Sequence, residues 1–543
     1  MKSLPIGNED FKDIRDSNCY YVDKTTMIGE ILDNAGTRVF LFTRPRRFGK
    51  TLNMSMIDAF FNIEYQGNNW FKGLKIERDP RFESERNRYP VIRISFKDLD
   101  VESIDGFTRD IKNMLRHVYD DYGYLEDSDK LTNLMKREYC EVLENDFEPA
   151  YALKNLTKML ERHHGTKTIV LIDEYDNPMQ NTYGSNDLTK IFPLMRRIMS
   201  STLKGNDSLK FGIVTGVMQI AKESLFPGLN NLNVNDVLSE RFDEHFGFTS
   251  EEVLNLLEEC GHPEKYEICR EWYDGYRFGK KEIYNPLSVL DFIYNNYKAD
   301  SYWAGTSGND IIHILVENAD SDMIDNLKKL GSGESINSTL DSKITYFDMN
   351  GKGDALYSVL VMAGYLKAEE CEGQYSLSIP NKEIYGVFFD AIPFNDNGEV
   401  KTLIISFARA VTNGDTEQMT SILRDLIIRA LSAKILDTEH AYQTFIIGLL
   451  MAFCGQYRIF GDRLESGLGF ADIIMEKKRA FDINVVMELK RCKDESDLES
   501  ESALALKQIE EKEYHYDLKG RTILYGISFC GKEPYIVSKV LDI

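Results

Sequence analysis

The sequence predicts an α/β protein built from several domains, and three observations support this prediction. At 543 residues the chain is too long for one hydrophobic core. Its first half alternates short apolar runs with helical stretches, which is the pattern of a largely parallel sheet covered by helices. Its last part contains a shorter series of helices and strands. We therefore expect a large N-terminal α/β domain, a small C-terminal one and helical segments between them.

Four apolar runs predict the strands of the first sheet. Each is short, rich in Val, Ile, Leu or Phe and free of strict alternation, as expected for strands buried on both faces. The runs are Arg38–Phe42, Pro90–Phe96, Thr168–Ile172 and Lys210–Thr215.

The middle of the chain is mainly helical. Residues 250–252, Ser-Glu-Glu, start a helix whose first turn is acidic, where negative charge complements the helix dipole. Leu356–Met362 predicts an apolar helix, and Gly364–Leu366 and Tyr375–Ile379 predict two short strands. A helix followed by a hairpin indicates a winged-helix segment. Tyr385–Lys434 is again helical and amphipathic.

Composition and charge restrict the classes of function. Hydrophobic residues make up 43% of the chain, which is ordinary for a globular protein. The net charge of −23 repels polyanions at long range, so that contact with nucleic acid would need a local basic patch. The sequence has no long apolar run and no apolar N-terminal stretch, and we expect a cytoplasmic protein without membrane contact. Eight scattered cysteines without a Cys-x-x-Cys pair argue against structural zinc and disulfides.

Residues 44–51 form a candidate phosphate-binding loop (P-loop) between the first strand and a helix. Gly49 lets the backbone approach phosphate groups, Lys50 reaches the β- and γ-phosphates, and the Thr51 hydroxyl coordinates Mg²⁺. Arg44 stands where the motif usually has its first glycine. On the tripeptide Gly-Lys-Thr alone, a helix N-terminus with an exposed lysine is an equal alternative. The predicted residues for ATP, or alternatively GTP, are Arg44, Pro45, Arg46, Arg47, Phe48, Gly49, Lys50 and Thr51.

Two later strands end in side chains that suit the same site. Thr168–Ile172 is followed by Asp173, which would hold Mg²⁺ together with Thr51, and by Glu174, which would orient or deprotonate the attacking water. A fourth strand ends at Thr215, where a polar side chain could sense the γ-phosphate. The four strands suit a P-loop ATPase that has an extra strand between the strands of the P-loop and of the acid pair.

The last segment has the order of a small α/β endonuclease core. A helix over Glu439–Phe453 precedes two strands, a helix over Leu498–Tyr514 and a strand over Thr522–Phe529. Asp472 lies near the start of the first of these strands. Glu488 and Lys490, two residues apart on the second strand, share one face.

This carboxylate–lysine set is suited to metal-dependent phosphodiester cleavage. Asp472 and Glu488 would bind Mg²⁺, Glu439 could add a ligand, and Lys490 would position or activate water. Gln508 on the following helix is a further candidate for the pocket. By itself a Glu-x-Lys pair is usually an exposed ion pair, and this alternative weighs against the motif.

From these patterns we predict five segments. They are a P-loop domain over 1–249, a helical lid over 250–300, a winged-helix-like segment over 301–384, a helical connector over 385–434 and a restriction-endonuclease-like α/β domain over 435–543.

Several short motifs occur together with the arginine-rich loop 44–51. They are Tyr20–Thr25, Asp173–Asp176, Thr215–Val217, Gly228–Leu232 and Trp272–Tyr276. With them, essentially the whole chain resembles the prokaryotic AAA-ATPase-like family of proteins that carry a C-terminal PD-(D/E)xK nuclease domain. The resemblance implies that arginine is the norm at position 44, and that Asp472, Glu488, Lys490 and Gln508 occupy the nuclease positions.

The chain departs from the family pattern at three positions. Gln219, Ala471 and Gln443 stand where the family usually has Arg, Arg and His. Arg46, Arg47 or Arg241 could replace the first of these as a phosphate contact.

Two hypotheses follow. In the first, ATP and Mg²⁺ bound to the P-loop domain gate a metal-dependent nuclease that acts on DNA or RNA. In the second, the protein is a non-cleaving nucleotide-dependent switch with a degenerate nuclease fold. AAA-type ATPases often form rings, so a homo-oligomer is possible, although Arg46 and Arg47 inside the loop favour a self-sufficient monomer or dimer.

Overall fold

The structure is a computed structural model. It describes residues 2–541 except 145, 183–187, 220–231, 304–322, 324–325, 328, 331–333, 342–352, 372, 392–398, 431–437, 451–456, 462–464, 467–468, 479–482 and 517. The chain divides into two compact units, residues 1–391 and 392–543, which are described separately below. No helix in the described ranges has the length and apolar character needed to cross a membrane.

The first unit is built on a parallel sheet with the strand order β2-β3-β4-β1-β5. Its strands are β1 (Val39–Thr43), β2 (Val91–Ser95), β3 (Thr168–Asp173), β4 (Leu209–Gly216) and β5 (Leu232–Asn235). The four predicted strands are confirmed to within two residues. The sequence does not predict β5, because its Leu-Asn-Val-Asn pattern is short and half polar. As predicted, an additional strand, β4, lies between β1 and β3.

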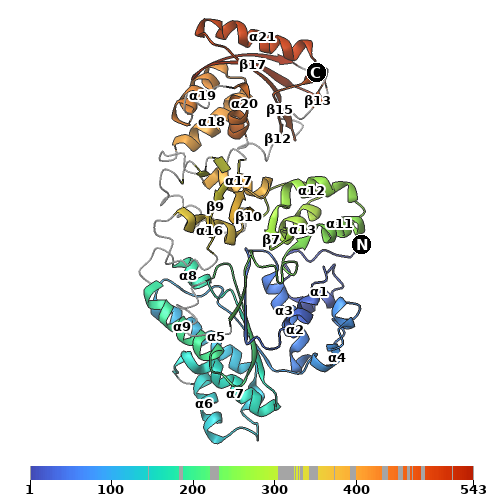
Figure 1. Cartoon of the computed structure of the whole chain (residues 1–543), viewed down its shortest axis with the longest axis vertical. Coiled ribbons are helices and arrows are strands. Elements are labelled where there is room, and N and C mark those ends of the chain that lie inside the picture. The colour runs from blue at the N-terminus through green and yellow to red at the C-terminus, as the bar shows by residue number, and fades with distance from the viewer. Residues whose placement is uncertain are drawn as a thin grey trace. The chain divides into compact units, whose positions relative to one another are not determined.

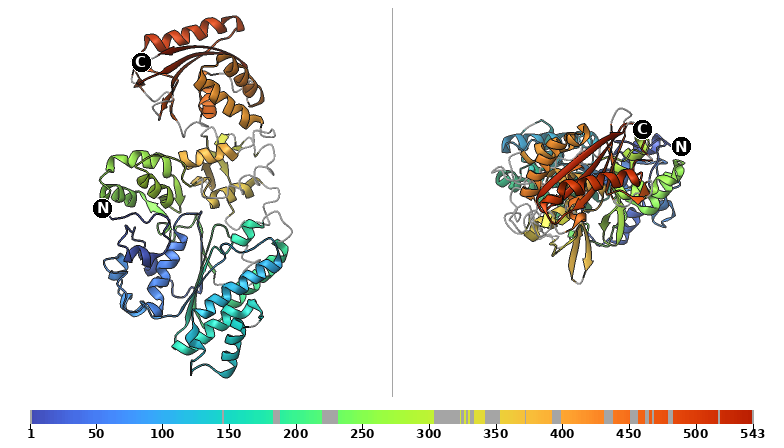
Figure 2. Two further views of the ribbon diagram at one scale, coloured as in Figure 1. Left: turned by 180° about the vertical axis from the view of Figure 1, so that it is seen from behind. Right: turned by 90° about the horizontal axis from the view of Figure 1, so that it is seen from above.

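Helices cover both faces of this sheet (Figures 1 and 2). One face carries α1 (Phe11–Asp16), α2 (Thr26–Asp33), α3 (Lys50–Phe61) and α4 (Phe82–Glu85). The other carries α5 (Ile104–Asp120), α7 (Ala152–His164) and α9 (Leu188–Leu203), with α6 (Asn133–Glu144) packed on α5 and α7 and the short α8 (Asn177–Asn181) after β3. The strands are thus buried on both sides, and every residue of β1 and β3 is buried.

The parallel register brings the carboxyl ends of β1, β3 and β4 together. Phe42 pairs with Thr215 across β1 and β4, and Ile172 pairs with Val214 across β3 and β4. The P-loop follows β1 and the acid pair ends β3, so that both lie at the same sheet edge, where ligands bind in open α/β sheets.

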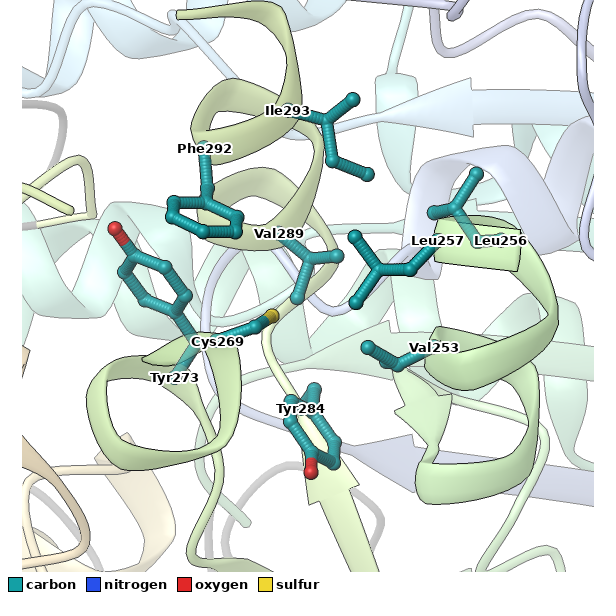
Figure 3. Close-up of a cluster of buried hydrophobic side chains, with 9 residues drawn as sticks. All are labelled: Val253, Leu256, Leu257, Cys269, Tyr273, Tyr284, Val289, Phe292 and Ile293. Carbon is teal, nitrogen blue, oxygen red and sulfur yellow. The ribbon is translucent and has the colours of Figure 1, made fainter. Parts of the chain in front are cut away.

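The lid is a helical layer with its own apolar core. It contains α11 (Ser250–Glu259), α12 (Tyr266–Tyr273), α13 (Pro286–Tyr294) and a small sheet of β6 (Phe248–Thr249), β8 (Lys281–Tyr284) and β7 (Tyr276–Phe278). Figure 3 shows side chains of the three helices and of β8 converging on this core. The predicted helix start at Ser250 is confirmed by a capping box between Thr249 and Glu252. The β7–β8 hairpin was not predicted, although Gly279 makes its turn with φ of +51°.

The segment that follows is a helix with a three-stranded antiparallel sheet. It comprises β9 (Ile336–Ser338), α16 (Gly353–Ala363), β10 (Lys367–Cys371) and β11 (Gln374–Ser378), and α17 (Lys382–Ala391) closes the unit. The predicted helix and hairpin are present, but the first strand begins at Lys367 instead of Gly364. Gly364 has φ of +88° and ends α16, while the Tyr365 N–H bonds to the Leu360 carbonyl, so these residues form the helix cap.

The second unit has a mixed sheet with the order β12-β15-β16-β17-β18. The helix α21 (Leu498–Glu511) covers one face, and α18 (Glu399–Asn413), α19 (Thr416–Ala430) and α20 (Glu439–Leu450) cover the other (Figure 1). The strands are β12 (Tyr457–Phe460), β15 (Ile473–Lys477), β16 (Asn484–Arg491), β17 (Thr522–Cys530) and β18 (Glu533–Leu541), with a separate pair β13 (Glu465–Ser466) and β14 (Gly469–Phe470).

Two features of this unit differ from expectation. The sequence does not predict β12 or β18, because β12 is short and β18 is an edge strand that contains Pro534. The helices predicted as a connector over 385–434 are divided between the units. α17 belongs to the first unit, whereas α18 and α19 pack on the second sheet, where the Tyr525 hydroxyl donates to the Val411 carbonyl at 2.6 Å.

Candidate functional site

The loop after β1 has the backbone of a phosphate-binding loop. Gly49 is left-handed, with φ of +78°, and it begins α3. The buried Lys50 ammonium group donates to the carbonyl oxygens of Arg44 (3.0 Å) and Pro45 (2.9 Å). Within the described residues, the N–H groups of residues 46–49 have no hydrogen-bond acceptor. The loop therefore offers free N–H donors and a helix N-terminus to an anion.

Burial lowers the pKa of Lys50, and the negative charges of Glu174 and Asp173 oppose that effect. The ammonium group is thus kept near two carboxylates without a direct ion pair to either. A bound phosphate group would offer the Lys50 ammonium group a negative charge. Its oxygens would also replace the two loop carbonyls as hydrogen-bond acceptors.

The Arg44 side chain lies away from the cavity described below. It is fully buried, and its guanidinium group donates to the carbonyls of Thr43 (2.9 Å), Asn235 (2.7 Å) and Phe242 (3.2 Å). Burial lowers the pKa of Arg44 to about 10. Two aromatic rings lie at 5.1 and 5.0 Å from the guanidinium carbon, those of Phe246 and Phe278. The side chain therefore joins the P-loop to β5 and the lid. The Arg44 N–H donates to the Gly216 carbonyl at 3.1 Å, so the backbone of Arg44 offers no free donor for the phosphate contact that the sequence predicts, and its guanidinium group lies away from the cavity.

The end of β3 places two carboxylates beside the loop. Asp173 accepts hydrogen bonds from the Thr215 hydroxyl and from the Glu174 N–H (3.1 Å). Glu174 has φ of +50°, a strained backbone for a residue with a side chain. Burial raises the pKa of Glu174, and the Lys50 charge lowers it. The Thr215 hydroxyl is committed to Asp173, so its role as a γ-phosphate sensor stays a prediction.

A cavity of about 380 Å³ opens over the P-loop and is large enough for a small ligand. Of the predicted loop residues, Arg46 to Thr51 line it, together with Glu174. A second cavity of about 330 Å³ is lined by Thr51, Asp173 and Glu174. The predicted Mg²⁺ ligands Thr51 and Asp173 therefore face a common space beside the larger cavity.

The N-terminal segment and the lid form the apolar walls of the larger cavity. Tyr20, Tyr21 and Val22 line it from one chain segment, and Phe248, Leu287 and Leu290 line it from the lid. The N-terminal segment and the lid therefore enclose the space in front of the P-loop.

Lys24 joins the N-terminal segment to the lid through an ion pair with Glu252. Its ammonium group donates to Glu252 and to the Glu244 carbonyl, each at 2.6 Å. Asp23, in contrast, is committed to local turns and to the Lys75 N–H. The lid residues of the cavity give no signal in the sequence, because Phe248 of β6 and Leu287 and Leu290 of α13 are ordinary apolar positions.

The arginines that could contact phosphate have different positions. The Arg46 guanidinium donates to Gln180 at 2.7 Å, and Gln180 donates to the buried Asp176 carboxylate at 2.9 Å. Arg47 also lines the cavity. Arg241 donates to Asn34 and does not line either cavity described above. Gln219 is buried, and the motif residues 228–231 lie outside the described residues.

The second unit brings Asp472, Glu488, Lys490 and Gln508 together. Glu488 accepts from the Lys490 ammonium group (2.9 Å) and from the Gln508 amide on α21. Asp472 precedes β15 and accepts from the Leu489 N–H at 2.6 Å. Side chains from the residue before β15, from β16 and from α21 thus lie close together, as the sequence predicts for the carboxylates and the lysine.

The charges of this cluster are only partly balanced. Burial and the charge of Glu488 raise the pKa of Asp472 to about 7, and burial also raises the pKa of Glu488 against the effect of Lys490. Burial alone would lower the pKa of Lys490, but the hydrogen bond to Glu488 leaves it raised. The Glu488 Oε2 atom is buried without a hydrogen-bond partner among the described residues. An uncompensated carboxylate oxygen of this kind suits a cation.

The predicted third ligand, Glu439, is not part of this close cluster. It is the exposed first residue of α20, and its negative charge is the smallest of the causes that raise the pKa of Asp472 and the pKa of Glu488. In the described ranges, no three His, Cys, Asp or Glu side chains are arranged to hold a metal ion. Gln443 on the same helix instead donates to the Asp472 carbonyl at 2.7 Å and fixes that backbone.

Two segments of the chain match known protein families. Residues 5–226 match the family described as predicted AAA-ATPase, and residues 437–539 match the PD-(D/E)XK nuclease superfamily. An "Uncharacterized protein in vnfD 5'region" from Azotobacter chroococcum mcd 1 is 30% identical over 309 residues, covering 56% of this chain. The chain spans about half (54%) of that relative. The first matched segment contains the P-loop and the acid pair, and the second contains the carboxylate–lysine cluster.

Proposed function

We propose, from the premise that this chain joins an AAA-ATPase-like domain to a domain of the PD-(D/E)XK nuclease superfamily, that it binds ATP with Mg²⁺ and uses the nucleotide state to control metal-dependent phosphodiester cleavage. The observation that carries the nucleotide part is the left-handed Gly49 at the start of α3, which faces a cavity of about 380 Å³ beside Thr51 and Glu174. The observation that supports cleavage is the meeting of Asp472, Glu488 and Lys490.

The residues of the first unit fit a nucleoside triphosphate. The free N–H groups of residues 46–49 would bind phosphate oxygens, and Lys50 would exchange the two loop carbonyls for the β- and γ-phosphates. Thr51 and Asp173 would hold Mg²⁺, which neutralises phosphate charge when it is bound. The base would pack between the tyrosines of the N-terminal segment and the lid.

Hydrolysis would depend on Glu174. Its carboxylate lines both cavities, where it can orient a water molecule or accept its proton. Arg46 is the best-placed arginine of this chain to stabilise the developing charge, because it lines the cavity and is held there by Gln180.

In the second unit, Asp472 and Glu488 would hold a divalent cation that supplies Lewis acidity and an activated water. The unpartnered Glu488 Oε2 atom fits this role. Lys490 lies beside Glu488 and would position the water or offset charge on the scissile phosphate. Gln508 would keep Glu488 in place during this step.

A non-cleaving switch is the second candidate. It is favoured by the separation of Glu439 from the cluster, by Ala471 and Gln443 and by the net charge of −23. In that case the nucleotide would regulate an interaction, and the second unit would act as a binding domain.

The nucleotide site is tested by the Lys50→Ala variant. We expect its affinity for Mg²⁺–ATP to fall about tenfold or more, because a charge-assisted contact to phosphate is lost. Isothermal titration calorimetry measures this change. Lys158→Ala, which removes an exposed lysine of α7, is the matched control and should bind like the wild type. Equal affinity of the Lys50→Ala variant would exclude the P-loop assignment.

The cleavage site is tested with single- and double-stranded DNA and RNA in the presence of Mg²⁺ or Mn²⁺, with ATP, with ADP and without nucleotide. We expect cleavage that depends on the nucleotide and falls about 100-fold in the Asp472→Asn and Lys490→Ala variants. Lys507→Ala, at an exposed lysine of α21, should cleave normally. Activity that survives both site variants contradicts the assignment, and a fully inactive wild type that still binds ATP favours the switch.

A further inference from the structure

Two cysteines stand side by side at the carboxyl ends of β16 and β17. These strands are parallel, and Arg491 of β16 pairs with Phe529 of β17 near their carboxyl ends. The next residue of each strand is a cysteine, so the same register sets Cys492 beside Cys530. The Cys492 N–H bonds to the Phe529 carbonyl at 2.9 Å, which continues the ladder to this point. Facing residues of parallel strands direct their side chains to the same face of a sheet.

The separation of the two residues suits a covalent bond. Neighbouring strands lie about 4.8 Å apart, and disulfides join residues whose Cα atoms are about 4.4–6.8 Å apart. The Cys492 thiol is directed toward β17, since it donates to the Phe529 carbonyl at 3.4 Å. Burial raises the pKa of Cys492, and the charge and hydrogen bond of Cys530 raise it further, in agreement with the neighbouring positions of the two residues at the ends of the paired strands.

The two thiols differ in access to solvent. Cys492 is buried, with 7% of its surface exposed, whereas Cys530 is partly exposed. A small oxidant in solution therefore reaches Cys530 first. Cys492 then lies next to the oxidised Cys530 sulfur and can attack that sulfur.

We propose that Cys492 and Cys530 are a redox modification site that forms a reversible disulfide between β16 and β17. A hydroperoxide oxidises the Cys530 thiol to a sulfenic acid and is itself reduced to an alcohol or to water. The Cys492 sulfur then attacks the Cys530 sulfur, the S–S bond forms, and the sulfenic hydroxyl leaves as water with the thiol proton. A dithiol reductant reverses the reaction by thiol–disulfide exchange.

The disulfide would act at the edge of the carboxylate–lysine cluster. Cys492 follows Lys490 by two residues and Glu488 by four, so the three positions have the same alternation along the strand. Fixing this end of β16 to β17 restrains the backbone that carries Lys490. The expected consequence, slower phosphodiester cleavage by the oxidised protein, rests on the proposed function.

The test uses the reduced full-length protein, treated with hydrogen peroxide and then with N-ethylmaleimide to block free thiols. Tryptic mapping without reductant should show the fragment beginning at Cys492 linked to fragment 522–532, and a dithiol should separate them. Cys530→Ser and Cys492→Ser should each abolish the link. Cys371→Ser, at an exposed cysteine on β10, should retain it.

Recovery of both cysteines as N-ethylmaleimide adducts after oxidation, or of either one linked elsewhere, would overturn the proposal. Circular dichroism of the two serine variants shows that the missing link does not reflect unfolding. Cleavage measured before oxidation, after oxidation and after re-reduction tests the consequence separately. If the disulfide forms and the protein remains fully active, only the proposed effect on Lys490 is overturned. If the reduced protein never cleaves, the result counts against the proposed function, and tryptic mapping still tests whether the disulfide forms.

Discussion

At the scale of single residues, Arg44 has a structural role within a functional motif. A glycine at this position of a P-loop provides backbone freedom. Here the buried guanidinium group of Arg44 instead donates hydrogen bonds to three carbonyls, those of Thr43, Asn235 and Phe242. These carbonyls come from β1, from the end of β5 and from the loop before the lid. The arginine therefore holds together the elements that surround the P-loop.

This arrangement predicts that Arg44→Gly destabilises the protein, although it restores the usual motif. The variant leaves a cavity and three carbonyls without their donor, and we expect a loss of about 3 kcal/mol in the free energy of unfolding. Thermal and urea unfolding measure the loss. Arg88→Gly, at an exposed arginine, is the control and should change stability much less. An Arg44→Gly protein as stable as the wild type would show that the buried hydrogen bonds contribute little.

At the scale of elements, Glu383 on α17 ties three segments of the first unit together. Its carboxylate is fully buried and accepts from the Ser288 hydroxyl of α13 (2.8 Å) and from the N–H groups of Tyr302 and Trp303 (2.7 Å each). The Trp303 indole in turn donates to the Arg46 carbonyl in the P-loop at 3.2 Å. One carboxylate thus links the lid, the segment after it and, through Trp303, the P-loop.

The pKa of Glu383 gives this junction a dependence on pH. Burial raises the pKa of Glu383 to about 7 from 4.5, with the charge of Asp291 as a smaller cause, while its three donors oppose the rise. The folded state therefore binds a proton that the unfolded state releases, and stability falls as pH rises from about 4.5 to about 7. The glutamine of the Glu383→Gln variant does not titrate. Over that pH range the free energy of unfolding of this variant should therefore rise by about 3 kcal/mol relative to that of the wild type. Unfolding midpoints of both proteins measured from pH 4.5 to 8 check this, and parallel curves would contradict it.

At the scale of the whole molecule, the chain consists of two units that each have their own sheet and core. Among its described residues, the helices α18 to α21 cover the five-stranded sheet of the second unit, and buried residues of β15, β16, β17 and α21 contribute to its core. The boundary at residue 391 separates α17 from α18.

We therefore predict that residues 392–543 fold when expressed alone. The fragment should unfold in one cooperative transition, because its sheet and covering helices are complete within it. Circular dichroism during heating measures this. A fragment that starts at residue 435, as the sequence-based boundary suggests, lacks α18 and α19 and is the comparison. It should be less stable, since the Tyr525–Val411 hydrogen bond and the packing of α19 on β18 are lost. Equal stability of the two fragments would contradict the assignment of these helices to the second unit.

The sequence by itself determined the elements whose chemistry is local. The strands β1 to β4 follow from their apolar runs, the P-loop from Gly49-Lys50-Thr51 after a strand, and the carboxylate–lysine set from its spacing on two strands. The strands that it did not predict are short, half polar or at a sheet edge, where the hydrophobic pattern is weak.

Only the tertiary structure decided what depends on contacts between distant segments. It turned the Arg44 side chain away from the cavity, covered the P-loop with apolar lid residues and placed Glu439 outside the cluster around Glu488. It also set Cys492 beside Cys530, although the sequence separates them by 38 positions and suggested only scattered thiols. The physical reason is that side-chain direction and strand register are fixed by packing over long sequence distances, which a local pattern of residues does not record.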